Sequence, residues 1–221
     1  NTWTPTEGGP MLTVFLSPKG GTGTTVTAAA WALAAAGSAG RSLLIDMCGD
    51  ARAALGMAEA DTPGLNDWLG ETQPAGTDDL ISLGTAVGNV MVVHPGSRYV
   101  TGAPRWNALR DAIAAQDCPV ILDAGTQFVP DEVRGAAHRT WMVVRPCYLT
   151  LRRATRLPRP DGVIVVREPG RALTVRDVEA VMGVGVVATV PFDPAVSRAV
   201  DAGLLPARWD DVLGRHLPPV N

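Results

Sequence analysis

A glycine-rich run, SPKGGTGTT, occupies residues 17–25 and directly follows the apolar run Met11–Leu16. Glycines allow backbone amides to approach and surround an anion, and a helix that begins near Thr25 would add the positive end of its dipole. Strand, glycine-rich turn and helix in this order are the setting of a phosphate site, and a chance cluster of glycines would rarely match all three. The run therefore predicts a phosphate-binding loop, with an ordinary strand-to-helix turn as the alternative.

The elements around this loop follow a repeating strand–helix pattern. Short apolar runs with β-branched residues predict strands at Met11–Leu16, Ser42–Asp46, Val90–Val93, Val120–Asp123, Trp141–Val144, Gly162–Val166 and Val184–Val190. Helical spacing predicts helices at Thr25–Ala36, Arg105–Ala115, Thr174–Met182 and Ala195–Ala202, with a short one near Leu65–Leu69. Continuous hydrophobicity indicates strands covered on both faces. We therefore expect an α/β fold: a doubly wound, mostly parallel sheet of about seven strands with helices on both faces.

Length and composition favour one cytoplasmic domain. The chain has 221 residues, 46% of them hydrophobic, and a net charge of −3, which excludes disorder as the dominant state. Polar residues 1–10 are expected to form a flexible tail, and residues 11–221 a single domain. The three cysteines are odd in number and widely spaced, which excludes a disulfide scaffold and favours a reducing cytoplasm. Neither a secretion signal nor a membrane-spanning run is expected.

The loop sequence resembles the deviant Walker A motif, KGGxxKT or KGGxGKT, of the ParA/MinD group of P-loop nucleotide-binding proteins. The positions that match are Lys19, Gly20, Gly21, Thr22 and Gly23. The resemblance extends as a pattern over roughly residues 11–205 and implies the P-loop NTPase fold, ATP or ADP as ligand, and Mg²⁺. It also implies that Lys19 reaches across a homodimer to the partner's nucleotide, and that Thr25 holds Mg²⁺.

One position of this motif departs from the family. Thr24 stands where the family has the lysine that contacts the β and γ phosphates. A charge-assisted hydrogen bond of that kind is worth about 1.5–3 kcal/mol, or roughly 10- to 150-fold in affinity. Thr24 is therefore expected to remain part of the nucleotide-binding loop while weakening binding, and to impair hydrolysis more, because the lysine also stabilises the transition state.

A second departure follows the next strand. In the family this strand ends Asp-x-Asp, and the second aspartate helps to position the attacking water. Asp46 fits the first position and is expected to be a metal-site residue. Cys48 occupies the second position. Asp50 is a candidate replacement for that catalytic role, or equally an N-cap for a helix at Ala51–Leu55. Cys48 is interpreted as a small packing residue rather than a reactive thiol.

A third motif is the strand Val120–Asp123, which ends in an aspartate like a Walker B motif and predicts that Asp123 holds Mg²⁺ through water. Gly125 fits the family's flexible switch after this strand. The strand near Gly162 and the P-x-D sequence after Val190 resemble the base-binding region of the family. By that resemblance, Arg167 and Pro191 would lie near the purine.

The predicted partners follow partly from charge. Four arginines cluster within eight residues and are either a surface for DNA without sequence preference or a solvated helix end: Arg152, Arg153, Arg156 and Arg159. The terminal sequence RHLPPVN contains two prolines and little apolar surface, so no amphipathic membrane anchor is expected. The three histidines form no metal-ligand pattern.

Two hypotheses of function result. The leading one is a ParA/MinD-like nucleotide-binding protein that is a weakly active or inactive ATPase and acts as a scaffold, with a protein partner, in spatial organisation such as DNA partition or a cell-pole or division-site assembly. The alternative is an active dimeric ATPase with a rebuilt site, in which Lys19 acts in trans and Asp50 positions water. A relative of metabolic amidotransferases or synthetases shares this fold, but the chain offers no additional Cys/His pair for that chemistry.

Overall fold

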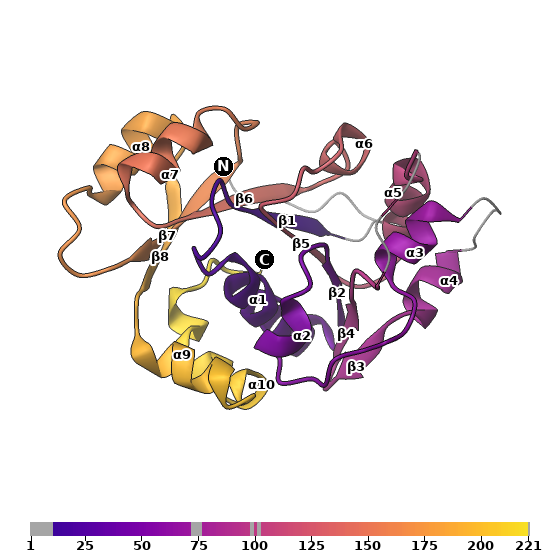
Figure 1. The fold of residues 1–221 in the computed structure, drawn as a ribbon. Helices are drawn as coiled ribbons and strands as arrows, with labels where there is room; N and C mark the ends of the chain where they lie inside the picture. Colours follow the sequence, from indigo (N-terminus) through magenta and orange to yellow (C-terminus); the bar gives the residue numbers. More distant parts are fainter. Residues whose placement is uncertain (1–10, 72–76, 98–99, 101–102, 221) are drawn as a thin grey trace.

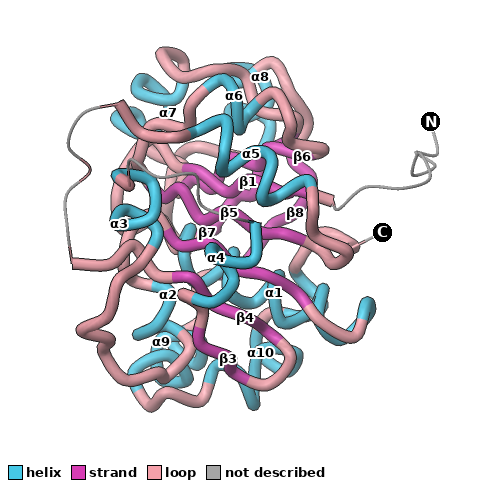
Figure 2. Tube along the Cα trace, turned by 90° about the vertical axis from the view of Figure 1, so that its right-hand side faces the viewer, coloured by secondary structure: helices cyan, strands magenta, loops and turns pink. Residues whose placement is uncertain are grey.

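A single twisted sheet forms the centre of the protein in a computed structural model, which describes residues 11–71, 77–97, 100 and 103–220 (Figures 1 and 2). The sheet has eight strands in the order β3-β4-β2-β5-β1-β6-β7-β8. The strands are β1 (Leu12–Leu16), β2 (Ser42–Asp46), β3 (Thr85–Val87), β4 (Val90–Val93), β5 (Val120–Gly125), β6 (Arg139–Val144), β7 (Gly162–Arg167) and β8 (Val186–Pro191). All neighbouring pairs are parallel except β3 and β4.

Helices cover both faces of this sheet (Figure 1). The helices are α1 (Thr24–Ala39), α2 (Ala51–Ala54), α3 (Leu65–Gly70), α4 (Thr77–Ser82), α5 (Trp106–Ala114), α6 (Asp131–Arg134), α7 (Tyr148–Ala154), α8 (Val175–Met182), α9 (Pro194–Asp201) and α10 (Leu205–Val212), with a 3₁₀ turn at Gly214–His216. Helices α3 to α8 contribute to one hydrophobic cluster, and α1, α2, α9 and α10 to the other. The expected doubly wound α/β architecture is therefore confirmed.

Helix α1 positions the glycine-rich loop because it packs closely on the centre of the sheet. Its buried face consists mostly of alanines, whose small side chains allow a near approach of helix and strands. Trp31 fills the remaining space against Phe15 and Trp141, with ring centroids 5.3–6.0 Å apart. The indole N–H of Trp31 also donates to the Pro218 carbonyl, at 3.2 Å, which holds the C-terminal segment against this face.

The structure adds elements to those expected from the sequence. β3 is an eighth strand, antiparallel to β4 at the edge of the sheet, and it is only three residues long and largely exposed, so it lacks the apolar run that marks the others. Helices α4, α6, α7 and α10 were also not predicted. The expected N-terminal tail, residues 1–10, lies outside the described residues. Among the described residues, no helix has the length and apolar character needed to cross a membrane.

Candidate functional site

The glycine-rich loop lies between β1 and α1 at the carboxyl edge of the sheet. Gly21 and Gly23 have φ angles of +76° and +89°, which L side chains adopt only with strain. Gly23 is also the N-cap of α1, so the helix dipole ends at the loop. The loop is joined to the neighbouring strand β5 because the Ser17 amide donates to the Gly125 carbonyl, at 2.6 Å. The predicted strand–loop–helix setting of a phosphate site is present.

Thr24 lies inside this loop. Its hydroxyl is 2.8 Å from the Thr22 hydroxyl, which donates to the Ser17 hydroxyl over 2.8 Å, and Ser17 in turn donates to the Lys19 carbonyl over 2.8 Å. All three hydroxyl-bearing side chains are buried. Position 24 therefore carries a short neutral group that is hydrogen-bonded within the loop, where the motif has a long cationic one. Lys19 is exposed and lines the cavity beside the loop.

Asp46 and Asp123 lie side by side because β2 and β5 pair in a register that places them opposite each other. Both carboxylates are fully buried. Asp46 Oδ1 accepts the amides of Cys48 and Gly49, at 2.7 and 2.9 Å, and Oδ2 accepts the amide of Ala51, at 2.9 Å. Burial raises the pKa of Asp46, and these amides oppose that rise. The side chain thus holds the loop after β2 in place.

Asp123 has far fewer partners. Oδ1 accepts the Gly125 amide, at 3.1 Å, whereas Oδ2 is buried and has no hydrogen-bond partner. Burial raises the pKa of Asp123 to about 7; the Thr25 hydroxyl and the Gly125 amide lower it, while the charge of Asp46 raises it further. A buried carboxylate oxygen without a partner is costly, and such atoms commonly face a ligand or ion. Asp123 fits a divalent cation, with Thr25 beside it.

Cys48 lies between these two carboxylates. Its thiol is 3.9 Å from the Asp123 carbonyl, and burial together with the charges of Asp123 and Asp46 raises its pKa to about 12. A Cβ atom at Gly125 would come within 2.3 Å of the Cys48 sulfur, so the loops after β2 and β5 are in tight contact. The thiol is therefore neutral at physiological pH in the metal-free protein and packs against the β5 loop.

Asp50 occupies the N-cap position of α2, but its side chain makes no capping hydrogen bond. The amide that it would cap, that of Ala51, is taken by Asp46 instead. Asp50 is exposed and lines the cavity beside the loop. The structure therefore does not show the capping hydrogen bond that was one of the two expectations for Asp50. The residue instead lines the cavity.

Two adjoining cavities open beside the loop and share Gly23, Val26 and Val200. The first, about 380 Å³, contains the predicted loop residues together with Cys48, Asp50, Gly125 and Thr126. The second, about 190 Å³, is mainly apolar and is lined by Pro191 together with Val166, Val190, Phe192 and Val196. A polar cavity that adjoins an apolar one matches the phosphate end and the base end of a nucleotide.

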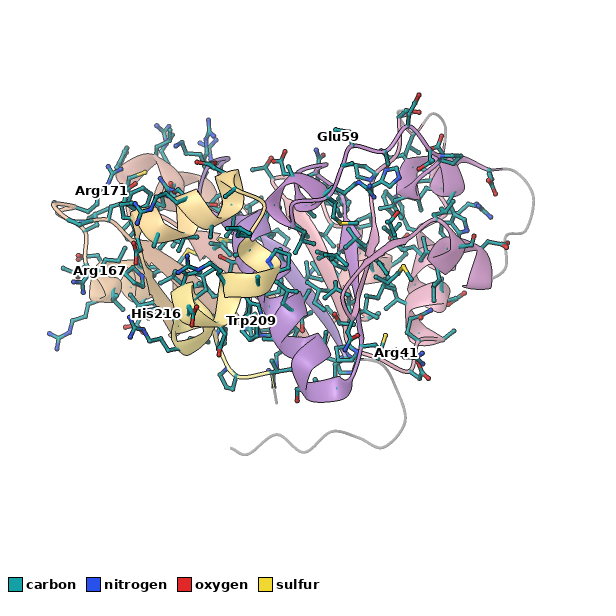
Figure 3. The ribbon with its side chains drawn as sticks, turned by 90° about the horizontal axis from the view of Figure 1, so that it is seen from below. Arg41, Glu59, Arg167, Arg171, Trp209 and His216 are labelled. Atoms are coloured by element: carbon teal, nitrogen blue, oxygen red, sulfur yellow. The ribbon has the colours of Figure 1, made fainter. Side chains whose placement is uncertain are left out.

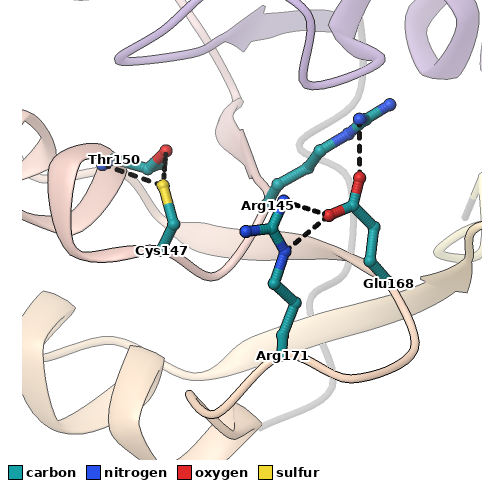
Figure 4. Close-up of polar contacts among 5 residues, drawn as sticks. All are labelled: Arg145, Cys147, Thr150, Glu168 and Arg171. Carbon is teal, nitrogen blue, oxygen red and sulfur yellow. Dashed lines mark hydrogen bonds and ion pairs between the residues drawn. The ribbon is translucent and has the colours of Figure 1, made fainter.

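Arg145, not Arg167, reaches the second cavity. Arg145 lines it, lies 5.0 Å above the Phe192 ring and forms an ion pair of 2.8 Å with Glu168, which also binds Arg171 (Figure 4). Arg167 has an exposed side chain and lies with Arg171 at the β7–β8 end of the molecule, far from Arg41 (Figure 3). Sequence reasoning missed Arg145, although its place directly after a predicted parallel strand is a signal for a site residue.

Cys147 begins α7 at the same edge of the sheet. Its sulfur accepts the Thr150 amide, at 3.5 Å, and lies 3.1 Å from the Thr150 hydroxyl (Figure 4). The Thr150 hydroxyl lowers the pKa of this thiol, and the charge of Lys19 contributes to the same shift. The predicted basic cluster follows α7 or lies within it, and its four side chains are exposed: Arg152, Arg153, Arg156 and Arg159.

The sequence itself matches no protein-family model and no curated protein. Solved structures are similar in fold. A ParA family ATPase from Chlorobium tepidum TLS superimposes with a TM-score of 0.71 at 17% identity, covering 93% of each chain. The septum site-determining protein MinD of Pyrococcus horikoshii OT3, in complex with Mg-ADP, gives 0.69 at 18% identity over 91% of this chain and 89% of that one. The MinC:MinD cell division protein complex of Aquifex aeolicus superimposes with a TM-score of 0.66 at 15% identity, covering 96% of this chain and 98% of that one.

The chain has the ParA/MinD fold. The resemblance that the loop motif indicated is thus confirmed at the level of the fold, over nearly the whole chain. Within the ParA/MinD fold, the glycine-rich loop, Asp46 and Asp123 lie together at the carboxyl edge of the sheet, where open α/β sheets bind ligands. Lys19 and Asp50 are both exposed at that edge.

Proposed function

We propose that this protein is a nucleotide-binding member of the ParA/MinD family whose degenerate P-loop makes it a weakly active or inactive ATPase. It serves as a scaffold in spatial organisation, such as DNA partition or a cell-pole or division-site assembly. The structural neighbours, a ParA family ATPase and a septum site-determining protein, support this class of role. The proposal includes a cytoplasmic homodimer that binds a protein partner, as the MinC:MinD complex of Aquifex aeolicus suggests.

The burial of Thr24 is the observation that carries this proposal. Its hydroxyl is hydrogen-bonded to the Thr22 hydroxyl within the loop and carries no charge. Thr24 therefore neither neutralises the charge of the phosphates nor stabilises the charge that develops in the transition state. The backbone amides of the loop and the dipole of α1 remain, and these bind phosphate without a side-chain cation. Nucleotide is therefore held, but turnover loses its main electrostatic support.

Mg²⁺ is held in this proposal by the Thr25 hydroxyl, Asp123 and Asp46. The unpartnered Oδ2 of Asp123 favours a cation at this place. When bound, the ion neutralises charge on the phosphates of the nucleotide. The MinD structure from Pyrococcus horikoshii with Mg-ADP supports both ligands. This chain's own residues contribute the loop amides to the phosphates, the apolar cavity with Pro191 to the base, and exclusion of water from the buried carboxylates.

The alternative is an active dimeric ATPase with a rebuilt site. Two observations favour it: Lys19 is exposed, and the Asp50 side chain makes no capping hydrogen bond. In that case Lys19 supplies the missing phosphate charge in trans, and Asp50 positions the water.

Calorimetric titration with Mg·ATP and Mg·ADP, with phosphate release followed in parallel, separates the two. The scaffold hypothesis expects binding with little or no turnover, and Thr24→Lys should tighten binding by roughly 10- to 150-fold. Thr24→Ser is the matched control, because it keeps the hydroxyl without adding charge. Turnover that disappears in Lys19→Ala and Asp50→Asn would instead support the rebuilt site. The absence of binding at millimolar nucleotide would refute both.

DNA is a further proposed partner, through the four exposed arginines on and after α7. Non-specific binding of this kind weakens steeply with salt, because it rests on counterion release. The variant Arg152→Glu/Arg153→Glu should lose binding to a mixed-sequence duplex at low salt. Arg176→Glu/Arg198→Glu, on helices α8 and α9, makes the same change in net charge and is the control; equal loss in both variants would point to overall charge and not to this cluster.

A further inference from the structure

Three side chains from two loops place metal-ligand atoms together beside the phosphate-binding loop. Asp46, Cys48 and Asp123 each offer one such atom, and the three atoms lie within 4.8 Å of one another. Two are carboxylates at the ends of β2 and β5, and the third is the thiol two residues after β2. In a tetrahedral zinc site, neighbouring ligand atoms are about 3.5 Å apart, so small side-chain rotations would close this cluster around an ion.

The hydrogen bonding of the two carboxylates leaves room for an ion. Asp123 Oδ2 is buried and without a partner, although the residue is 0% exposed. Asp46 Oδ2 accepts a single amide, that of Ala51, and so retains a second lone-pair direction. These free acceptor positions are independent of the clustering itself, because a carboxylate buried for structural reasons would have both of its oxygens satisfied.

The charge around the cluster favours a cation as well. The charged side chains that act most strongly on Cys48 are the carboxylates of Asp123, Asp46 and Asp50. Position 24, which would bring an ammonium group to this edge in the usual P-loop, carries Thr24 instead. Buried carboxylates are normally paired or bound to metal, since isolated charge is expensive to bury. The cluster therefore lacks the positive charge that its composition requires.

We infer that Asp46, Cys48 and Asp123 form a binding site for a thiophilic divalent cation of the Zn²⁺ class. Thiolate ligands favour Zn²⁺ and similar ions, whereas Mg²⁺ prefers an all-oxygen set. Three protein ligands leave a coordination position open, as in catalytic rather than structural zinc sites. On binding, the thiol loses its proton to water, and the sulfur–metal bond replaces the S–H bond.

The ion has a path to this site. Cys48 is half-buried and lines the cavity of about 380 Å³ beside the loop, together with Asp50 and Thr126. An ion can therefore approach the cluster from the cavity, on the side of Cys48. The inference rests on the proposed function in one respect: the two carboxylates assigned there to Mg²⁺ in the nucleotide complex hold the thiophilic ion here in the absence of nucleotide. It is therefore tested without nucleotide.

The test uses the full chain, stripped of metal with EDTA and kept reduced with a phosphine, titrated with Co²⁺ and separately with Cd²⁺. A thiolate bound to either ion gives a charge-transfer band in the near or middle ultraviolet. We expect one equivalent to produce this band. Cys48→Ser should abolish it, and Asp123→Asn should weaken binding at least about tenfold. Cys118→Ser and Cys147→Ser are matched controls that remove a thiol elsewhere and should leave the band unchanged.

The variant Cys48→Asp, which restores a carboxylate at this position, guards against misfolding as an explanation. It should bind Co²⁺ without the charge-transfer band and gain affinity for Mg²⁺ relative to Cd²⁺. The inference is overturned if the wild-type chain gives no band, or if the band survives in Cys48→Ser or vanishes in either control. Nucleotide titration of the same samples is read separately, so metal binding without nucleotide binding would refute the proposed function alone, and the reverse would refute this inference alone.

Discussion

The loops after β2 and β5 present two buried carboxylates that differ in almost everything except position. Asp46 and Asp123 are register partners on adjacent strands, and neither has exposed surface. Asp46 accepts three backbone amides and closes its own loop. Asp123 accepts one, and its second oxygen has no partner. The same residue type at the same depth is thus hydrogen-bonded through both oxygens on one strand and through one oxygen on the next.

This difference indicates where the protein gives up stability for function. A charge that is desolvated and only half hydrogen-bonded destabilises the folded state, and such sites persist where a ligand completes them. The amides around Asp46 show that this edge of the sheet is able to satisfy a carboxylate fully. The incomplete bonding of Asp123 is therefore what the proposed cation would complete.

Removing the two carboxylates in turn gives the largest expected contrast. Asp46→Ala leaves three amides without an acceptor and should lower the free energy of unfolding by about 3–4 kcal/mol. Asp123→Asn removes a poorly satisfied charge and should leave the protein at least as stable as wild type. Urea denaturation at pH 7.5 in EDTA measures both. Equal destabilisation by the two variants would show that both aspartates are structural.

The pH dependence of stability should report how poorly the Asp123 carboxylate is solvated. Its pKa of about 7 in the folded protein lies above the ordinary value of 3.8, so the folded state binds the proton more tightly than the unfolded state. The stability from this group is complete below about pH 4 and is lost as the pH rises through 7. The negative charges of Asp46 and Asp50 reinforce this rise in pKa, whereas the Thr25 hydroxyl and the Gly125 amide oppose it.

The stability advantage of Asp123→Asn over wild type should therefore shrink by about 2 kcal/mol between pH 8 and pH 5. Urea denaturation of both proteins across this range, in EDTA, provides the measurement. A constant difference would mean that Asp123 titrates in the ordinary range and is better solvated than its burial indicates.

The sequence predicted the position of these groups but not their bonding. A strand ending in aspartate after a glycine-rich loop was sufficient to place Asp123 and Asp46 at one edge, because parallel strands bring their carboxyl ends together. Which oxygen is satisfied depends on the backbone path of the next few residues, and that path has no signature in residue type. For the same reason the sequence left Asp50 open between a cap and a site residue.

Other parts of the fold and site were missed for physical reasons of their own. β3 is short, exposed and antiparallel, so it carries no apolar run. Arg145 reaches the second cavity because Glu168 and the Phe192 ring hold its guanidinium, and these partners are distant in sequence. Arg167 was expected near the purine by resemblance, yet its side chain is exposed at the end of β7 and does not line that cavity.

A double-mutant cycle should sharpen the comparison by testing whether the two loops act on each other. Gly125 has a φ of +50°, and a Cβ there would lie 2.3 Å from the Cys48 sulfur but 3.5 Å from its Cβ. Gly125→Ala should therefore be destabilising, and Cys48→Ala should recover about 1 kcal/mol of that loss. Gly88→Ala is the matched control, because its φ is +56° and nothing lies within 4 Å. Cys48→Ala should not rescue it, and rescue there would show that backbone strain, not the contact, is responsible.

The smallest effect is expected at the opposite edge of the sheet, where Arg41 and Asp117 form an ion pair whose side chains are 63% and 76% exposed. Here the charges are paired but solvated, whereas Asp123 is buried and incompletely paired. Water already satisfies both groups, so Asp117→Asn should change the free energy of unfolding by about 0.5 kcal/mol or less, and 1 M salt should remove even that. Urea denaturation at low and high salt checks both statements. A loss as large as that of Asp46→Ala would mean that the pairing of a carboxylate, and not its burial, decides its contribution in this fold.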